Sequence, residues 1–213
     1  TSDGMKKKTL RKLVNVLVKM LTRTEFIGLE NIPTSGGVIL AINHMSHIDT
    51  PIVFVNPVRS DITALVTTKY LERPLIKWFT ESAGGIWINR DIADFTAIQS
   101  ASKALAEGLA LGIAPEGTRS ISGKLQEGKP GTIMLALKSG APIVPVGITG
   151  TEDALKKLLR LRRPRITIQF GEAFTLPEFH PHHRSEELKR WTEILMRRIA
   201  ALLPEKYHGF YAH

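Results

Sequence analysis

The feature that most constrains the fold is a regular alternation between short runs rich in β-branched residues and longer runs with helical spacing. The short strand-like runs fall at residues 37–41, 62–66, 85–88, 112–114, 143–148 and 166–170. Strands that alternate with helices are typical of α/β domains, in which most neighbouring strands are parallel. The sequence therefore predicts an α/β fold: a single domain with a mixed, largely parallel sheet flanked by helices, plus an N-terminal amphipathic helix.

Several helix ends carry local signals. Asp94 can cap a helix whose apolar residues follow at helical spacing, and Gly140 stops a helix that begins near Thr132. Ser185 opens the last long helix, and Pro204 closes it. Because no internal repeat and no linker rich in Gly, Pro or Ser divides the chain, we expect one domain.

The chain is strongly basic and contains no cysteine. Its formal net charge of +9 calls for an acidic partner or surface, and nucleic acid, anionic lipid and a polyanionic cofactor are the ordinary candidates. The basic residues do not alternate with aromatic residues as in nucleic-acid-binding modules, so we expect no nucleic-acid partner. The absence of cysteine excludes disulfides, a thiolate nucleophile and a zinc site with sulfur ligands.

Basic residues gather first in the N-terminal segment, where they share a helical pattern with apolar residues. Residues 1–4 precede Met5 and are interpreted as a cloning remnant, residues 5–25 predict a basic amphipathic helix, and residues 26–213 form the main domain. Charges interrupt the helical segment, so it lacks the run of about 20 apolar residues that spans a bilayer. It is either an interfacial anchor on an anionic membrane or a helix packed on its own domain. A second basic run, 156–165, either extends the same surface or is a solvated face.

Two imidazoles and a carboxylate follow the first predicted strand, at His44, His47 and Asp49. If Asp49 lies one turn into a following helix, its carboxylate can accept a proton from one ring nitrogen of His44, which leaves the other nitrogen as a base. A metal site made by all three side chains is the alternative, although the chain shows no further His-rich loop to complete it. We expect His44 and Asp49 to be catalytic, no metal to be bound, and His47 to be a loop or capping residue.

A second polar segment, 115–120, follows the predicted strand 112–114. Gly117 permits close backbone approach, Thr118 offers a hydroxyl, and Arg119 can grip a phosphate with two parallel hydrogen bonds. The segment is thus a candidate phosphate cradle. The alternative is an ordinary charged turn with an ion pair between Glu116 and Arg119.

Together these segments resemble the glycerol-phosphate and lysophospholipid acyltransferase family, which is known for four ordered sequence blocks. The matching blocks lie at 43–49, 84–90, 115–120 and 143–146. Lys129 matches the lysine that follows the third block. Four blocks in the right order and spacing are far more specific than any one of them. The resemblance covers about residues 26–175, so 26–213 is interpreted as an acyltransferase domain.

The resemblance implies the transfer of an acyl chain from a thioester, acyl-CoA or acyl carrier protein, to a hydroxyl of a glycerol-phosphate lipid. It implies no covalent enzyme intermediate and no resident cofactor. His44 is then the base that deprotonates the hydroxyl, and Asp49 holds its ring. The residues that we expect to bind substrate are Arg90, Glu116, Gly117, Thr118, Arg119 and Lys129.

Among acceptors we expect 1-acyl-glycerol-3-phosphate (lysophosphatidate), whose acylation gives phosphatidate in phospholipid biosynthesis. Glycerol-3-phosphate or another lysophospholipid is the alternative acceptor. A metal-dependent hydrolase built on His44, His47 and Asp49 is the alternative from a different class. The expected location is the cytoplasmic face of the cell membrane, where a peripheral protein contacts an anionic surface.

Two positions depart from the family pattern. Ala114 replaces the bulkier residue usual before the third block, and Gly128 replaces the phenylalanine common before Lys129. Either change is expected to widen or loosen the acceptor pocket. The aromatic residues that are candidates for an acyl groove, or belong to an ordinary core, are Phe54, Trp78, Phe79 and Trp87.

Overall fold

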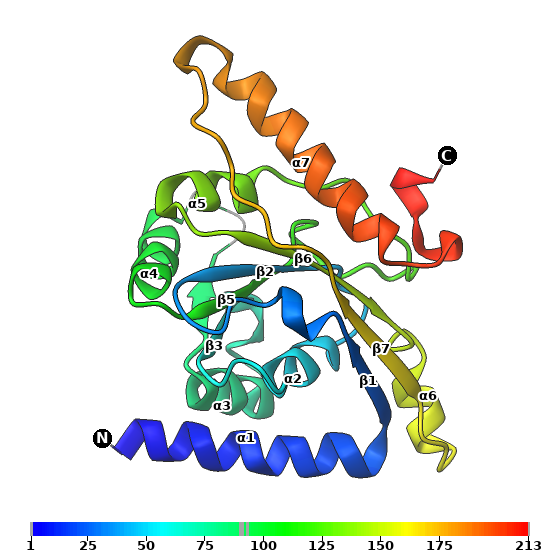
Figure 1. Ribbon diagram of the computed structural model, residues 1–213. Helices are drawn as coiled ribbons and strands as arrows, with labels where there is room; N and C mark the ends of the chain where they lie inside the picture. The colour runs from blue at the N-terminus through cyan, green and yellow to red at the C-terminus, as the bar shows by residue number, and fades with distance from the viewer. Residues whose placement is uncertain (1, 90–91, 93, 213) are drawn as a thin grey trace.

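The structure is a computed structural model that describes residues 2–89, 92 and 94–212 (Figure 1). Within these residues, seven strands form one sheet in the order β1-β7-β6-β2-β5-β3-β4. The strands are β1 (Arg23–Ile27), β2 (Val38–Ile42), β3 (Ile62–Thr67), β4 (Ile86–Ile88), β5 (Ala110–Ile113), β6 (Ile143–Thr149) and β7 (Arg165–Phe170). All neighbours are parallel except β6 and β7. The predicted α/β fold with a mixed, largely parallel sheet is confirmed.

Helices cover both faces of the sheet (Figure 1). One face carries α1 (Ser2–Leu21), α2 (Asp49–Phe54) and α3 (Pro74–Ala83). The other carries α4 (Phe95–Ala106), α5 (Gly131–Ser139) and α7 (Arg184–Ala201). The short helix α6 (Ala154–Leu159) lies beside β7, and single 3-10 turns lie at Leu29–Asn31, Thr68–Tyr70, Pro181–His183, Glu205–Tyr207 and Gly209–Tyr211.

The central strand β2 shows why the sheet needs two layers of helices. All five of its residues are buried, as expected for a parallel strand that is covered on both faces. Successive side chains point to opposite faces. Val38, Leu40 and Ile42 join the core under α1, α2 and α3, whereas Ile39 and Ala41 join the core under α4, α5 and α7.

The predicted strands are all present, with ends that differ by one or two residues. The predicted helix signals are confirmed as well. The carboxylate of Asp94 accepts a hydrogen bond from the N–H of Ala97 at the start of α4, and Gly140 ends α5 with a left-handed φ of 66°. Ser185 lies in the first turn of α7, which ends at Ala201, ahead of Pro204.

One strand is absent from the sequence prediction. The predicted N-terminal helix extends to residue 25, but α1 ends at Leu21 and β1 begins at Arg23. Strand β1 pairs with β7, in register from Arg23 with Arg165. Strand β1 lies at the edge of the sheet and has no fully buried residue, so its sequence lacks the continuous apolar run that marks the central strands. Among the described residues, no helix is both long enough and apolar enough to cross a bilayer.

Candidate active site

The candidate site lies at one edge of the sheet, where the carboxyl ends of β2, β5 and β6 meet. These three strands are parallel, so the loops that follow them emerge on the same side. The loop after β2 carries His44, and the loop after β5 carries the segment from Glu116 to Ser120. Two segments that are far apart in sequence thereby face each other.

His44 and Asp49 form a hydrogen-bonded pair in this loop. Asp49 is the first residue of α2 and is buried, and its Oδ2 lies 2.8 Å from Nδ1 of His44. The same oxygen accepts the backbone N–H groups of Met45 and Ser46, each at 2.8 Å. The carboxylate is therefore held from several sides, in the arrangement that the sequence predicts.

This geometry assigns the two ring nitrogens of His44 different roles. When Nδ1–H donates a hydrogen bond to Asp49, Nε2 has a free lone pair and can accept a proton from a substrate. The His44 side chain is 17% exposed, so a substrate can reach it. The buried carboxylate stabilises the imidazolium that forms when Nε2 is protonated.

The backbone of His44 is fixed by the second segment. Glu116 is buried, and its carboxylate accepts the N–H of His44 at 3.3 Å and the N–H of Gln126 at 2.8 Å. The N–H of Ser120 donates to the carbonyl oxygen of His44 at 2.7 Å. Burial raises the pKa of the Glu116 carboxyl, and the backbone hydrogen bonds partly oppose this rise. Both carboxylate oxygens of Glu116 are thus occupied within the protein.

Gly117 and Lys129 meet in the loop after β5. Gly117 has a left-handed φ of 69°, and a Cβ at this position would lie 3.0 Å from Cδ of Lys129. The glycine therefore leaves room for the lysine side chain to cross the loop. The backbone N–H of Lys129 donates to the carbonyl of Pro115 at 2.8 Å, which keeps the exposed lysine beside the candidate phosphate cradle.

Thr118 is exposed and Arg119 is half-buried. Burial lowers the pKa of the His47 imidazole, and the positive charges of Arg119 and His44 lower it further, so Arg119 lies within electrostatic range of this loop. The alternative ion pair between Glu116 and Arg119 is not formed among the described residues. Arg90, the remaining predicted substrate-binding residue, lies outside the described residues.

His47 contacts an aromatic ring. Its ring packs edge-on against Tyr70, with the centroids 5.3 Å apart. Over the part of the chain that the structure describes, no group of three His, Cys, Asp or Glu side chains lies close enough to hold a metal ion.

The C-terminal segment packs against the active-site loop. The sequence alone does not predict this contact. The hydroxyl of Tyr211 accepts the N–H of Gly128 at 2.9 Å, and the carbonyl of Tyr207 accepts the N–H of Leu125 at 2.8 Å. A Cβ at Gly128 would lie 2.5 Å from Cγ of Met196. The prediction that Gly128 widens the acceptor pocket is therefore wrong, because α7 fills the space. No local signal could have paired residues 83 positions apart.

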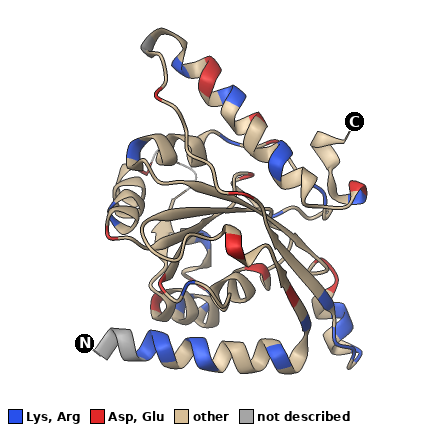
Figure 2. Cartoon of the chain, viewed as in Figure 1, with Lys and Arg blue, Asp and Glu red and all other residues tan. Residues whose placement is uncertain are grey.

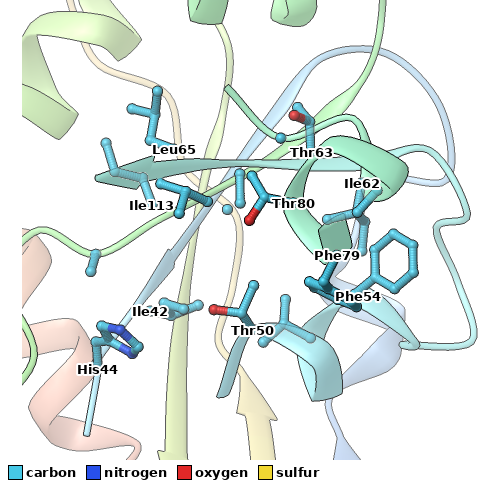
Figure 3. Close-up of a pocket in the computed structure, with 17 residues that line it drawn as sticks. Ile42, His44, Thr50, Phe54, Ile62, Thr63, Leu65, Phe79, Thr80 and Ile113 are labelled. Carbon is cyan, nitrogen blue, oxygen red and sulfur yellow. The ribbon is translucent and has the colours of Figure 1, made fainter. Parts of the chain in front are cut away.

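An apolar pocket opens beside His44, between the sheet and helices α2 and α3 (Figure 3). Its walls come from β2, β3, β5 and the two helices, and include Ile42, Phe54, Ile62, Leu65, Phe79 and Ile113. Ala64, Gly112 and Ala114 also line it, so small side chains leave the space open. Of the candidate groove aromatics, Phe54 and Phe79 line the pocket, whereas the Trp78 side chain is exposed on the surface.

Comparison with known proteins places this geometry in a family. A family model described as Acyltransferase matches residues 23–149. The chain is 34% identical over 128 residues to the 1-acyl-sn-glycerol-3-phosphate acyltransferase of Borreliella burgdorferi, covering 59% of this chain and 51% of that protein. It is 28% identical over 192 residues to an enzyme of the same name from Chlamydomonas reinhardtii, covering 88% of this chain and 55% of that protein. The chain thus spans about half the length of these two relatives.

A solved structure agrees with this result. The crystal structure of the 1-acyl-sn-glycerophosphate (LPA) acyltransferase PlsC from Thermotoga maritima superposes with a TM-score of 0.67 and 25% sequence identity. The match covers 92% of this chain and 79% of that one. The matched family region holds His44, Asp49 and the segment 115–120. The chain therefore belongs to the acyltransferase family.

Proposed function

We propose that the protein transfers a fatty acyl chain from a thioester, acyl-CoA or acyl carrier protein, to the free hydroxyl of 1-acyl-glycerol-3-phosphate, which yields phosphatidate. The observation that carries this proposal is the His44–Asp49 pair beside an apolar pocket. The acceptor rests on relatives that are named 1-acyl-sn-glycerol-3-phosphate acyltransferases. Glycerol-3-phosphate or another lysophospholipid is the alternative acceptor.

In the proposed reaction, Nε2 of His44 takes the proton of the acceptor hydroxyl as its oxygen attacks the thioester carbonyl carbon. The new C–O bond forms, the C–S bond breaks, and the thiolate that leaves takes the proton from His44. Asp49 stabilises the imidazolium between these steps. General-base catalysis of this kind contributes roughly 10²–10⁴-fold in rate. The chemistry uses no resident cofactor and no metal ion.

The acceptor phosphate is assigned to the cations of the site. Arg119 offers a planar fork of donors that matches a phosphate, Lys129 adds a point charge, and Arg90 is assigned to the same group from its sequence position. Gly117 and Thr118 border the acceptor. We assign Glu116 a positioning role, since its carboxylate already holds the backbone N–H of His44.

Part of the donor's acyl chain is assigned to the apolar pocket, whose free volume of about 70 Å³ is too small for a whole fatty acyl chain. An acyl chain gains about 0.8 kcal/mol for each methylene that leaves water, and the pocket offers aliphatic and aromatic walls within reach of His44. The thioester carbonyl then lies at the pocket mouth, next to the base.

The protein is proposed to act as a peripheral protein at the cytoplasmic face of the cell membrane, because its lipid acceptor resides there. Helix α1 supports this location. Its Val16 and Met20 are 60% and 58% exposed, and the exposed apolar residues of the same stripe are Leu13, Leu17 and Leu21. An amphipathic helix with such a stripe lies in the plane of the interface.

The direct test combines a set of donors with a set of acceptors. Acyl-CoA and acyl carrier protein thioesters are each incubated with lysophosphatidate, glycerol-3-phosphate and a neutral lysolipid, and products are identified by mass. We expect phosphatidate from lysophosphatidate, unaffected by a chelator. Transfer only to another acceptor would change the acceptor assignment. Hydrolysis that a chelator abolishes would replace the proposal with the metal-dependent hydrolase.

A further inference from the structure

A basic groove lies between α1 and β1, apart from the active-site pocket. It encloses about 710 Å³, which falls within the roughly 300–1,000 Å³ of pockets that hold organic ligands. The cations that line it are Lys8, Arg11, Lys12, Lys19, Arg23 and Arg163. No Asp or Glu is found among the described residues of its lining.

The groove forms because the segment that follows α6 packs against the end of α1. Figure 2 shows Lys and Arg recurring along α1 and gathered again on α6 and the turn that follows it. From that turn, the Arg163 guanidinium donates to the carbonyl oxygens of Lys19 and Thr22 at the end of α1. Arg163 thereby brings one cation of the second basic run to the N-terminal helix.

Two of the cations are structural, and four are available to a ligand. Arg11 donates to the backbone carbonyls of Phe54 and Asn56, and Arg163 is held as described. In contrast, no ion pair with another described residue engages the groove cations Lys8, Lys12, Lys19 and Arg23.

Asp61, which interacts electrostatically with one groove cation, does not neutralise the groove. Asp61 lies within electrostatic range of Arg11, but its carboxylate is already paired with the buried Arg59 at 2.6 Å. Several unpaired cations around one groove attract an anion whose negative charge is delocalised over several oxygen atoms. A phosphate group is such an anion.

The arrangement of basic and apolar residues around α1 indicates the source of that anion. Lys8, Lys12 and Lys19 recur at helical spacing on the side that lines the groove, whereas Val16 and Met20 belong to the apolar stripe on the outer side of the helix. Buried Leu10 and Val14 attach α1 to the domain. A helix whose outer stripe enters the acyl layer brings its flanking cations to the depth of the lipid phosphates.

We propose that this groove binds the phosphodiester head groups of anionic phospholipids in the bilayer. The inference rests on the membrane association proposed above and deepens it by naming a site. It separates two contributions: the apolar stripe of α1 supplies adsorption to any bilayer, and the groove supplies the preference for anionic lipid. The occupant is a lipid of the membrane and not the acceptor that is acylated at His44.

The test uses vesicle sedimentation with two bilayers, phosphatidylcholine alone and an equal mixture of phosphatidylcholine and phosphatidylglycerol. The groove variant combines Lys12→Gln, Lys19→Gln and Arg23→Gln. Its matched control, Lys138→Gln with Lys189→Gln and Arg190→Gln, removes the same charge from exposed positions on α5 and α7. A charge-preserving variant exchanges Lys12→Arg, Lys19→Arg and Arg23→Lys.

We expect the groove variant to lose roughly 100-fold in affinity for the anionic vesicles, since each of its three substituted basic residues contributes about fivefold near such a surface. Binding to pure phosphatidylcholine is expected to stay the same. The control variant is expected to lose at most about threefold on the anionic vesicles, because its charges lie away from the surface. The charge-preserving variant is expected to bind like the wild type.

Equal losses in the groove and control variants would overturn the proposal, because net charge alone would then explain binding. A groove variant that loses affinity for a single-stranded DNA oligonucleotide but keeps its vesicle binding would also overturn it, in favour of a nucleic-acid site. Wild-type protein without transfer activity on a water-soluble short-chain lysophosphatidate, but with the expected vesicle pattern, would refute the proposed reaction and leave the groove standing.

Discussion

The active site and the α1 groove both contain cations, but they differ in how rigidly the protein holds the residues around those cations. At the active-site edge, the polar framework is buried and bonded, with Asp49, Glu116 and Ser120 all fixed to backbone groups. In the groove, Lys12 and Lys19 stand exposed on one helix. Proton transfer requires atoms at defined distances, whereas adsorption requires only charge near a surface. Substitutions in the two regions should therefore differ in size and in kind.

The largest effect is expected from His44→Ala. Loss of the base should reduce the transfer rate by roughly 10²–10⁴-fold with little change in thermal unfolding, since the Asp49 carboxylate keeps its hydrogen bonds from two backbone N–H groups. The measurement is single-turnover transfer to lysophosphatidate. His47→Ala is the control, and its effect should be much milder. Comparable losses in both variants would contradict the assignment of a single base.

A smaller effect is expected from Arg119→Lys, which keeps the charge and removes the planar fork. Loss of a charge-assisted hydrogen bond costs about 1.5–3 kcal/mol, so kcat/KM for the acceptor should fall by roughly 10- to 100-fold. The KM for acyl-CoA should change little. Saturation curves for each substrate at fixed concentration of the other check this. Damage confined to the acyl-CoA curve would move Arg119 to the donor site.

The next prediction concerns the contact between the C-terminal segment and the active-site loop. Tyr211→Phe removes the hydroxyl that accepts the N–H of Gly128, at a cost of about 0.5–1.5 kcal/mol. We expect kcat to fall by up to about tenfold, because the loop that carries Lys129 loosens.

Tyr207→Phe serves as its control. The Tyr207 hydroxyl donates to the carboxylate of Glu152 at 2.7 Å, so this variant loses a charge-assisted hydrogen bond that does not touch Gly128. Tyr207→Phe should lower the unfolding temperature at least as much as Tyr211→Phe, and only Tyr211→Phe should lower kcat. Equal kcat values in the two variants would show that Tyr211 stabilises the fold without positioning the loop.

The smallest effect is expected on the outer stripe of α1. Met20→Ser should weaken binding to neutral and anionic vesicles alike, by roughly two- to fivefold, because a partly inserted side chain loses apolar burial. Groove substitutions, by contrast, should act on anionic vesicles alone. Sedimentation at low and high salt checks this, since the loss in Met20→Ser should not depend on salt. Unchanged binding would show that this stripe does not contact the bilayer.

Much of this protein is determined by short stretches of sequence. The strand runs carry their own pattern of β-branched residues, so the α/β fold was predictable without the structure. The His44–Asp49 pair was predictable for the same reason, because the two residues are five positions apart and one helical turn brings them together. Asp94 and Gly140 likewise act on the backbone next to them.

Only the tertiary structure decided the features that join distant segments. Residues 23–25 of β1 fall within the predicted helix, because this edge strand has no fully buried residue and only its pairing with β7 identifies it as a strand. Tyr211 reaches Gly128, Met196 fills the space beside it, and Arg163 closes the α1 groove. None of these contacts leaves a periodic or local trace in the sequence. Each depends on how the sheet orders its strands, because that order sets which loops and helices become neighbours.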